Sequence, residues 1–262
     1  MRPGLAGFSL VFSMVLFGLP ASNFLDLGFF GWSGFLLSRS TFSGSSDGFR
    51  SPTIEDSVSW GAPNCGVSPS LSDAEISVRD ESLQLSINPF LKPKVHFNAM
   101  SAKALKWQGN RVYDFAVSFG LLNTPKADVS YVANPEALVL NLIRVDEDGR
   151  AREAVVEWIL NPWSSDYGRV KIRTPTGEKL VGSIEPDTSW HRIRVVGDWR
   201  TNNYLRIDVD GSSILLREQL LFETKPWSNS FDIYVELGNA WNNCQHTFAV
   251  SALYDNIEIF YR

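Results

Sequence analysis

His191 and Tyr204 are side chains whose types suit acid–base chemistry on a sugar. β-Elimination from a uronate needs a base to remove the C5 proton, an acid for the leaving oxygen, and a cation to neutralise the carboxylate. Arg192 and Arg169 could supply that charge. His191, however, alternates with apolar residues along its segment, which places it on an apolar strand face. These residues therefore fit either a catalytic set in an open groove or a buried structural histidine, and the apolar alternation favours the second.

Cations recur at alternate positions of three predicted strands. They are Arg169, Lys171, Arg173, Arg192, Arg194 and Arg206. If these strands lie side by side in one sheet, its outer face carries a basic stripe that could bind carboxylates or sulfates through bidentate Arg contacts. The alternative is a solvated face on which the cations pair with Glu157, Glu178, Glu185 and Asp208. The paired face is favoured, because any outer sheet face needs alternate polar residues.

Loop aromatics form a second group of candidate ligand contacts. The apolar C–H faces of sugars stack on aromatic rings. Trp163, Trp199, Trp227 and Trp241 lie in polar loops, and Tyr167 follows the first of them. For each of these Trp residues, ligand contact and packing are equally balanced. Four together favour at least one ligand contact.

A calcium site is the one metal site that the residues suggest. Asp255 and Asn256 could ligate a structural Ca²⁺ together with backbone carbonyls. The alternative is an Asx turn before the last strand, and it is slightly favoured. No nucleotide-binding glycine loop or nucleophile motif is present, so we expect no required cofactor.

Short strands must position these residues. Apolar and polar residues alternate over Trp190–Val196 and over Tyr204–Val209, and Asp210-Gly211 follows as a tight turn, which predicts a central antiparallel hairpin. Other strands are predicted at Glu75–Val78, Leu83–Ile87, Val112–Leu122, Leu138–Val145, Ala154–Leu160, Arg169–Arg173, Leu180–Ile184, Ile214–Leu221, Phe231–Leu237, Thr247–Ala252 and Ile257–Tyr261, with weaker candidates at Val58–Trp60 and Lys92–Phe97. No segment has a sustained helical period. This pattern predicts an all-β, two-sheet antiparallel β-sandwich.

The central hairpin resembles the centre of a concanavalin A-like (laminin G-like) jelly roll. In that family a Trp-opened strand precedes a strand that closes on an Asp-Gly turn, here carried by Trp190, His191, Asp198, Leu205, Ile207, Val209, Asp210 and Gly211. Leu253–Tyr261 (LYDNIEIFY) resembles the final strand of carbohydrate-active jelly rolls. The resemblance covers roughly Asp56–Arg262 and implies a jelly-roll sandwich. Retaining glucanases of this fold carry a Glu-x-Asp-x-(x)-Glu strand, which this sequence lacks, so that hydrolase activity is not expected.

The N-terminus predicts export. Arg2 precedes the apolar run Leu5–Leu19, and small residues follow near Ala21–Asn23, as in a secretory signal peptide. An uncleaved membrane anchor is the alternative, since Phe24–Leu37 is a second apolar run. We therefore expect a signal peptide over 1–22, a Ser/Gly-rich linker over 23–55 and a jelly-roll domain over 56–262, with a secreted, periplasmic or cell-surface location.

Two cysteines and the bulk charge add further limits. Cys65 and Cys244 fit an exported protein with one disulfide, and the jelly-roll resemblance implies neighbouring first and last strands that such a bridge could join. Two reduced thiols are the alternative.

The 262-residue chain has a net charge of −5, which argues against a nucleic-acid partner. Contact with a membrane is expected only through an uncleaved N-terminal segment.

Two functions from different classes follow. The first is an exported glycan-binding module that uses the loop Trp residues and the cationic faces. The second is a polysaccharide lyase that uses His191 and Tyr204 on an acidic glycan. The binding function is favoured, and a purely structural exported protein is also compatible with the sequence. Elimination requires His191 in an open groove, whereas binding expects it to be buried with loop Trp residues at the rim of a groove.

Overall fold

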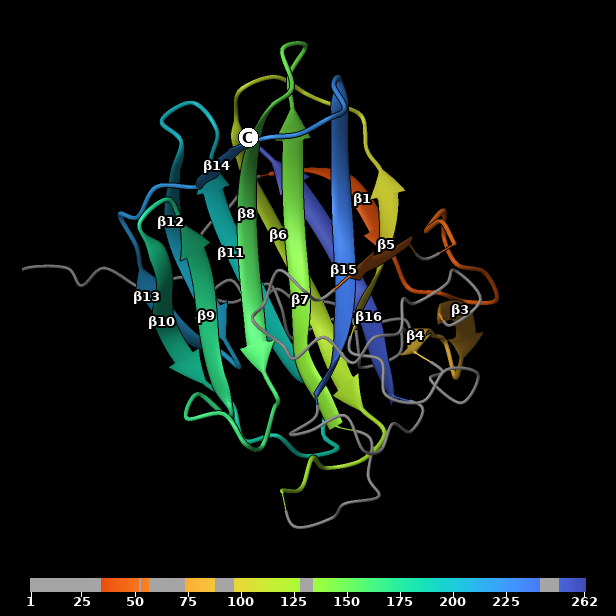
Figure 1. The fold of residues 1–262 in the computed structure, drawn as a ribbon. Helices are drawn as coiled ribbons and strands as arrows, with labels where there is room; N and C mark the ends of the chain where they lie inside the picture. Colours follow the sequence, from red (N-terminus) through yellow and green to blue (C-terminus); the bar gives the residue numbers. More distant parts are fainter. Residues whose placement is uncertain (1–33, 52, 57–73, 88–96, 128–133, 241–249) are drawn as a thin grey trace, which may run out of the picture. The chain divides into compact units, whose positions relative to one another are not determined.

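Two antiparallel sheets form the described part of the chain. The computed structural model describes residues 34–51, 53–56, 74–87, 97–127, 134–240 and 250–262, all strand, turn or loop. The sheets lie as two layers in Figure 1: the sheet that contains residues 150–159, called sheet B, is toward the viewer, and the sheet that contains residues 112–121, called sheet A, lies behind it. The predicted two-sheet antiparallel β-sandwich is therefore confirmed. Within these residues no helix is long and apolar enough to cross a membrane.

Among the described residues each sheet contains eight strands. Sheet A has the order β13-β12-β11-β6-β16-β4-β3, with β1 paired to β16, and sheet B has the order β10-β9-β8-β7-β15-β5-β2, with β14 paired to β8. The bounds are β1 Phe35–Ser40, β2 Thr53–Asp56, β3 Ala74–Arg79, β4 Ser82–Ile87, β5 Phe97–Ala104, β6 Val112–Leu121, β7 Asn134–Val145, β8 Arg150–Ile159, β9 Arg169–Thr174, β10 Gly177–Ser183, β11 His191–Asp198, β12 Asn203–Val209, β13 Ser212–Leu215, β14 Leu221–Thr224, β15 Ser230–Ala240 and β16 Val250–Tyr261.

One apolar layer fills the space between the sheets. On β6 in sheet A, Tyr113, Phe115, Val117 and Phe119 all point inward and are fully buried, as their alternation predicts. Alternate residues of β7 and β8 in sheet B are buried in the same cluster: Leu138, Leu140, Leu142, Ala154, Val156 and Trp158. The intervening residues of these strands consequently form the outer faces of the sandwich.

The central hairpin forms as predicted. β11 and β12 pair antiparallel, with Ile193 opposite Val209 and Val195 opposite Ile207, and all four side chains are buried. β11 also pairs with β6, so the hairpin lies within sheet A next to a strand of which nearly every residue is buried.

Residues 34–51 and 53–55, the described part of the segment predicted as a flexible linker, belong to the sandwich, which corrects the expectation for these residues. β1 pairs with β16, and β2 pairs with β5. Between them, Phe42 is 0% and Phe49 is 4% exposed, so two aromatic side chains anchor this Ser/Gly-rich stretch in the core. Asp47 stabilises the turn by accepting hydrogen bonds from the backbone N–H groups of Thr41 and Phe42. The apolar anchors therefore outweigh the composition of the segment.

The last two predicted strands are one strand, β16, with a bulge. Its pairing with β6 shifts between Asp255 and Glu258, and Asn256 has a φ of 48°. The inserted residue changes which positions face inward, from Tyr254 before the bulge to Ile257 after it. The signal peptide, Cys65, Cys244, Trp241, Val58–Trp60 and residues 92–96 lie outside the described residues.

Candidate functional site

A row of three charged side chains and one apolar side chain crosses the outer face of sheet B. The strand register places Lys171 of β9, Glu157 of β8, Val139 of β7 and Glu236 of β15 opposite one another. Their chain neighbours Val156, Leu138 and Leu237 point into the core, so this row faces outward. Neighbouring strands are about 4.8 Å apart, which spaces the row's backbone across about 14 Å.

The row lies in a hollow of about 180 Å³. Its apolar surface includes Ala137, Val139 and Ile159. Its charged lining comes from five strands and the β8–β9 loop: Glu136, Glu157, Asp166, Lys171, Glu178 and Glu236. An apolar surface with a few convergent polar groups is the usual composition of a small-molecule site.

Ion pairs fix the position of Lys171. Its Nζ lies 2.6 Å from Asp166 Oδ2 and 2.7 Å from Glu178 Oε2. Burial lowers the pKa of Lys171, but the bonds to these two carboxylates outweigh burial and raise it. Lys171 is therefore a charged, positioned donor at one side of the hollow.

Two carboxyl groups of the hollow are costly to ionise. Burial raises the pKa of Glu157, and the ion pair with Arg173 opposes that rise. Burial also raises the pKa of Glu136, against a 2.8 Å hydrogen bond that Asn161 Nδ2 donates to it, and the charge of Glu157 raises it further. A nearby cation or hydrogen-bond donor favours the charged form of such a buried carboxyl group.

Exposed tryptophans flank the outer face of sheet B at both ends. Trp163 is 36% exposed in the β8–β9 loop, next to Ser164 of the hollow. Trp227 is 42% exposed in the β14–β15 loop, which bonds to the β7–β8 turn through Lys225 N and Gly149 O. The face between them follows β8, Arg150–Ile159, for about 31 Å at 3.4 Å per residue.

Tyr167 is bonded to another loop and does not line the hollow. Its hydroxyl donates a hydrogen bond to the carbonyl of Pro125 at 3.1 Å. Burial raises its pKa, and the charge of Glu185 adds to that rise. Tyr167 thus ties the loop that carries Trp163 to the segment after β6.

The basic stripe, the less favoured of the two alternatives, does not form across one sheet, because its cations lie in two different sheets. Arg169, Lys171 and Arg173 are on β9 of sheet B, whereas Arg192, Arg194 and Arg206 are on β11 and β12 of sheet A. The paired-face alternative describes both groups better. Arg173 pairs with Glu157, Lys171 with Glu178, and Arg206 with Asp208 at 2.9 Å.

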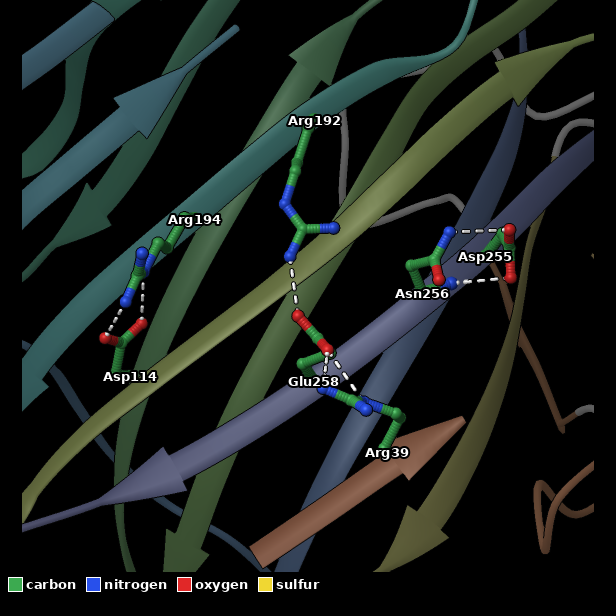
Figure 2. Close-up of polar contacts among 7 residues, drawn as sticks. All are labelled: Arg39, Asp114, Arg192, Arg194, Asp255, Asn256 and Glu258. Carbon is green, nitrogen blue, oxygen red and sulfur yellow. Dashed lines mark hydrogen bonds and ion pairs between the residues drawn. The ribbon is translucent and has the colours of Figure 1, made fainter. Parts of the chain in front are cut away.

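The outer face of sheet A carries its own ion pairs, shown in Figure 2. Arg194 binds Asp114 through two parallel bonds of 2.7 and 2.6 Å. Glu258 accepts from both Arg192 and Arg39. These guanidinium groups point at carboxylates of neighbouring strands, which is the geometry of a stabilised sheet face.

Asp255 and Asn256 contact each other at the bulge of β16. An Asx turn joins an Asp side chain to the backbone two residues on, whereas these bonds join adjacent residues, so the alternative of an Asx turn before the last strand stays a prediction. The backbone N–H and Nδ2 of Asn256 donate to the two carboxylate oxygens of Asp255 at 2.6 and 2.8 Å (Figure 2). Burial raises the pKa of Asp255. Within the described ranges no three His, Cys, Asp or Glu side chains gather as a metal site. A structural Ca²⁺ stays a prediction.

His191 lies inside the edge of the sandwich. It is 9% exposed, and its ring packs edge-on against Trp158 with centroids 5.0 Å apart. Nδ1 and Nε2 lie 2.7 Å from Asp210 and 3.1 Å from Asp187. The ring therefore joins two loops, which is the placement expected for a binding module and not for a base in an open groove.

Tyr204 is a core residue, which corrects its candidacy as a catalytic acid. It is 0% exposed, and its hydroxyl accepts a 2.8 Å hydrogen bond from Val155 N and lies 3.0 Å from the carbonyl oxygen of Arg173. Burial raises its pKa far beyond the physiological range. The hydroxyl connects β12 of sheet A with β8 and β9 of sheet B, and no solvent reaches it.

Tyr204→Phe should therefore act on stability. The change leaves the buried Val155 N–H without its acceptor, and we expect the free energy of unfolding to fall by about 1–3 kcal/mol in urea titrations. Unchanged stability, together with loss of a lyase activity present in the natural chain, would contradict this structural role.

Trp199 is also buried, which removes it from the loop contacts expected from the sequence. It is 1% exposed, and its ring meets that of Tyr113 edge-on at 5.2 Å. By contrast Trp190, which directly precedes β11 of sheet A, is 49% exposed. Its ring lies so close to the backbone of Gly120 that a Cβ there would be 3.1 Å from it. The missing side chain of Gly120 makes room for the ring.

Sequence reasoning missed three acidic residues of the hollow. Glu136, Asp166 and Glu236 were not singled out. Glu236 alternates with buried Val235 and Leu237, so its outward direction was readable from the pattern. Its position one strand away from β7, and two from Glu157, depends on strand order, which alternation does not encode.

Comparison with known proteins finds similarity of fold. No protein-family model matches the chain, and no curated protein sequence matches it. Similar solved structures include a sialidase (11% identity, TM-score 0.47), of which this chain spans 18% while 86% of this chain is covered. Others are the alginate lyase Aly36B (12%, 0.44, covering 87% and 96% of the two chains) and the Emp47p carbohydrate recognition domain (11%, 0.48, 87% and 95%). These likenesses assign no role to any residue here.

Proposed function

We propose that this chain is an exported glycan-binding module, and that it binds a saccharide in the hollow on the outer face of sheet B. The observation that carries the proposal is the hollow itself. It combines an apolar surface, fixed carboxylates and an ammonium, with exposed Trp163 in the adjoining loop. A pyranose presents hydroxyl groups to such acceptors and donors, and it offers a C–H face to an indole ring.

The charged groups suit binding because they are already positioned. Lys171 is held by two carboxylates, and Glu157 is held by Arg173. Preorganised side chains lose little conformational entropy when a ligand arrives, so more of the contact energy contributes to affinity. His191 and Tyr204 are buried in packing roles, which gives elimination at these two residues no geometric support.

Export is the second part of the proposal. It is supported by Arg2, the apolar run Leu5–Leu19 and the small residues near Ala21. Mass spectrometry of the intact protein recovered from the medium or periplasm should show cleavage near Ala21–Asn23. A full-length chain retained in the cytosol would contradict export.

A polysaccharide panel tests binding. We expect the protein to be retained on at least one member of a set of immobilised neutral, amino-sugar and uronate polysaccharides. Trp163→Ala should weaken that binding about tenfold, equal to about 1.4 kcal/mol, because it removes the stacking surface beside the hollow.

Trp190→Ala is the matched control, since it removes an indole of similar exposure from the opposite sheet. It should leave retention unchanged. Loss of binding in Trp190→Ala with full binding in Trp163→Ala would place the ligand on sheet A and contradict the proposed site. No retention on any polysaccharide would contradict the function.

A further inference from the structure

We propose that the saccharide held in the hollow of sheet B carries an ammonium group, as an amino sugar with a free amine does. This inference rests on the proposed function and names the chemical class of its ligand. A basic stripe would have favoured an acidic glycan, whereas this inference names a cationic one.

The charge of the lining is the first support. Five carboxylates line the hollow, from Glu136, Glu157, Asp166, Glu178 and Glu236, against the single ammonium of Lys171. Two guanidinium groups border them, Arg169 at 3.4 Å from Asp166 and Arg173 paired with Glu157. Five acidic groups still face three basic ones. An anionic sugar would add to the excess negative charge, whereas a cationic sugar would reduce it.

Glu136 provides the second support. Its partner in the described part of the chain is the neutral amide of Asn161, and it has no cation within ion-pairing distance there. Lys171, the cation of the lining, already contacts Asp166 and Glu178. Glu136 is thus a half-buried carboxylate with capacity for one more donor. A ligand ammonium has three N–H donors and the complementary charge.

The pH dependence of ligand affinity provides an additional test of the ammonium preference. Burial, together with the charge of Glu157, raises the pKa of Glu136 above its usual 4.5. Glu157, Asp166, Glu178, Glu236, Lys171, Arg169 and Arg173 are the other charged groups around it. Below the raised pKa, Glu136 is neutral and attracts a cation less. Above the pKa of the sugar amine, near 8 for an α-amino group, the ligand loses its charge. Affinity should therefore pass through a maximum between these limits.

Calorimetric titration with three oligosaccharides of equal length tests the inference. They are the hexamers of β-1,4-linked glucosamine, of N-acetylglucosamine and of a uronate, at pH 6 and low salt. We expect the glucosamine hexamer to bind about tenfold tighter than its acetylated counterpart, the gain of one charge-assisted bond. Glu136→Gln should reduce this preference to less than about threefold. Glu75→Gln on β3, an equal change of charge at an exposed position of sheet A, should keep it.

The outcomes separate this inference from the function beneath it. Equal binding of the charged and acetylated hexamers, still weakened by Trp163→Ala, overturns the ammonium preference and leaves the glycan site in place. Tightest binding of the uronate hexamer also overturns it. Absence of binding by all three hexamers and by the whole polysaccharide panel overturns both proposals.

Discussion

Replacing Trp199 by alanine is expected to lower the free energy of unfolding by about 3–5 kcal/mol, the usual cost of removing a buried Trp. The side chain is 1% exposed, and it packs edge-on against Tyr113. It also covers Gly197, where a Cβ would come within 2.7 Å of the ring, so the indole fills the space that this glycine leaves. Urea unfolding followed by circular dichroism measures the loss.

Trp163→Ala is the matched comparison and should give the opposite result. At 36% exposure its removal should change stability by less than about 1 kcal/mol while it weakens saccharide binding. Trp199→Ala should retain normal affinity wherever it remains folded. A stable Trp199→Ala variant that has lost binding would mean that Trp199 contacts the ligand, contrary to its place in the core.

Arg173→Met is expected to cost about 2–3 kcal/mol at pH 7, because it leaves Glu157 buried without its counter-ion. Glu157 is 2% exposed, while the side chain of Arg173 is 27% exposed, so the loss should be somewhat below that for a fully buried pair. Combining the change with Glu157→Gln should recover part of the stability, because the double variant has no uncompensated charge.

The cost should depend on pH in a defined direction. Burial raises the pKa of Glu157 above its ordinary 4.5, and Arg173 opposes that rise, so removing Arg173 raises it further. A carboxyl whose pKa is higher when folded destabilises the protein progressively as pH rises from the unfolded pKa through the folded one. The defect of Arg173→Met should therefore be smaller at pH 4 than at pH 7, measured by urea unfolding. An equal defect at both pH values would show that Arg173 acts through packing alone.

Strand existence and side-chain direction could be predicted from alternation. The pattern of Val112–Leu122 gave β6 and its buried face, and the Trp190–Val209 region gave the β11–β12 hairpin with His191 on the inner side. In these segments local periodicity and burial agree, because each strand has one face in the core. The strands β1 and β2 were not predicted, because Phe42 and Phe49 are isolated buried residues in a Ser/Gly-rich stretch.

The candidate site could be predicted only in part. Lys171 and Trp163 were selected for their chemistry, and both lie at or beside the hollow. The basic stripe failed because identical alternation on β9 and β11 gives no information about which sheet each strand joins. The prediction of Trp199 as a loop contact to ligand was wrong because a polar loop can still direct its aromatic residue into the core. Strand order and loop conformation arise from contacts between distant segments, which a single local pattern does not contain.

Binding of a glycan on the outer face of sheet B can be tested most directly by two-dimensional amide NMR. Labelled protein would be titrated with each oligosaccharide that corresponds to the polysaccharide panel. We predict that the largest shifts occur at the amides of Val139, Glu157, Ser164 and Glu236, which surround the hollow. The amides of Ala116 and Arg192 on sheet A should stay unchanged. Shifts clustered around Trp190 on sheet A, or no shifts with any saccharide, would contradict the proposed site.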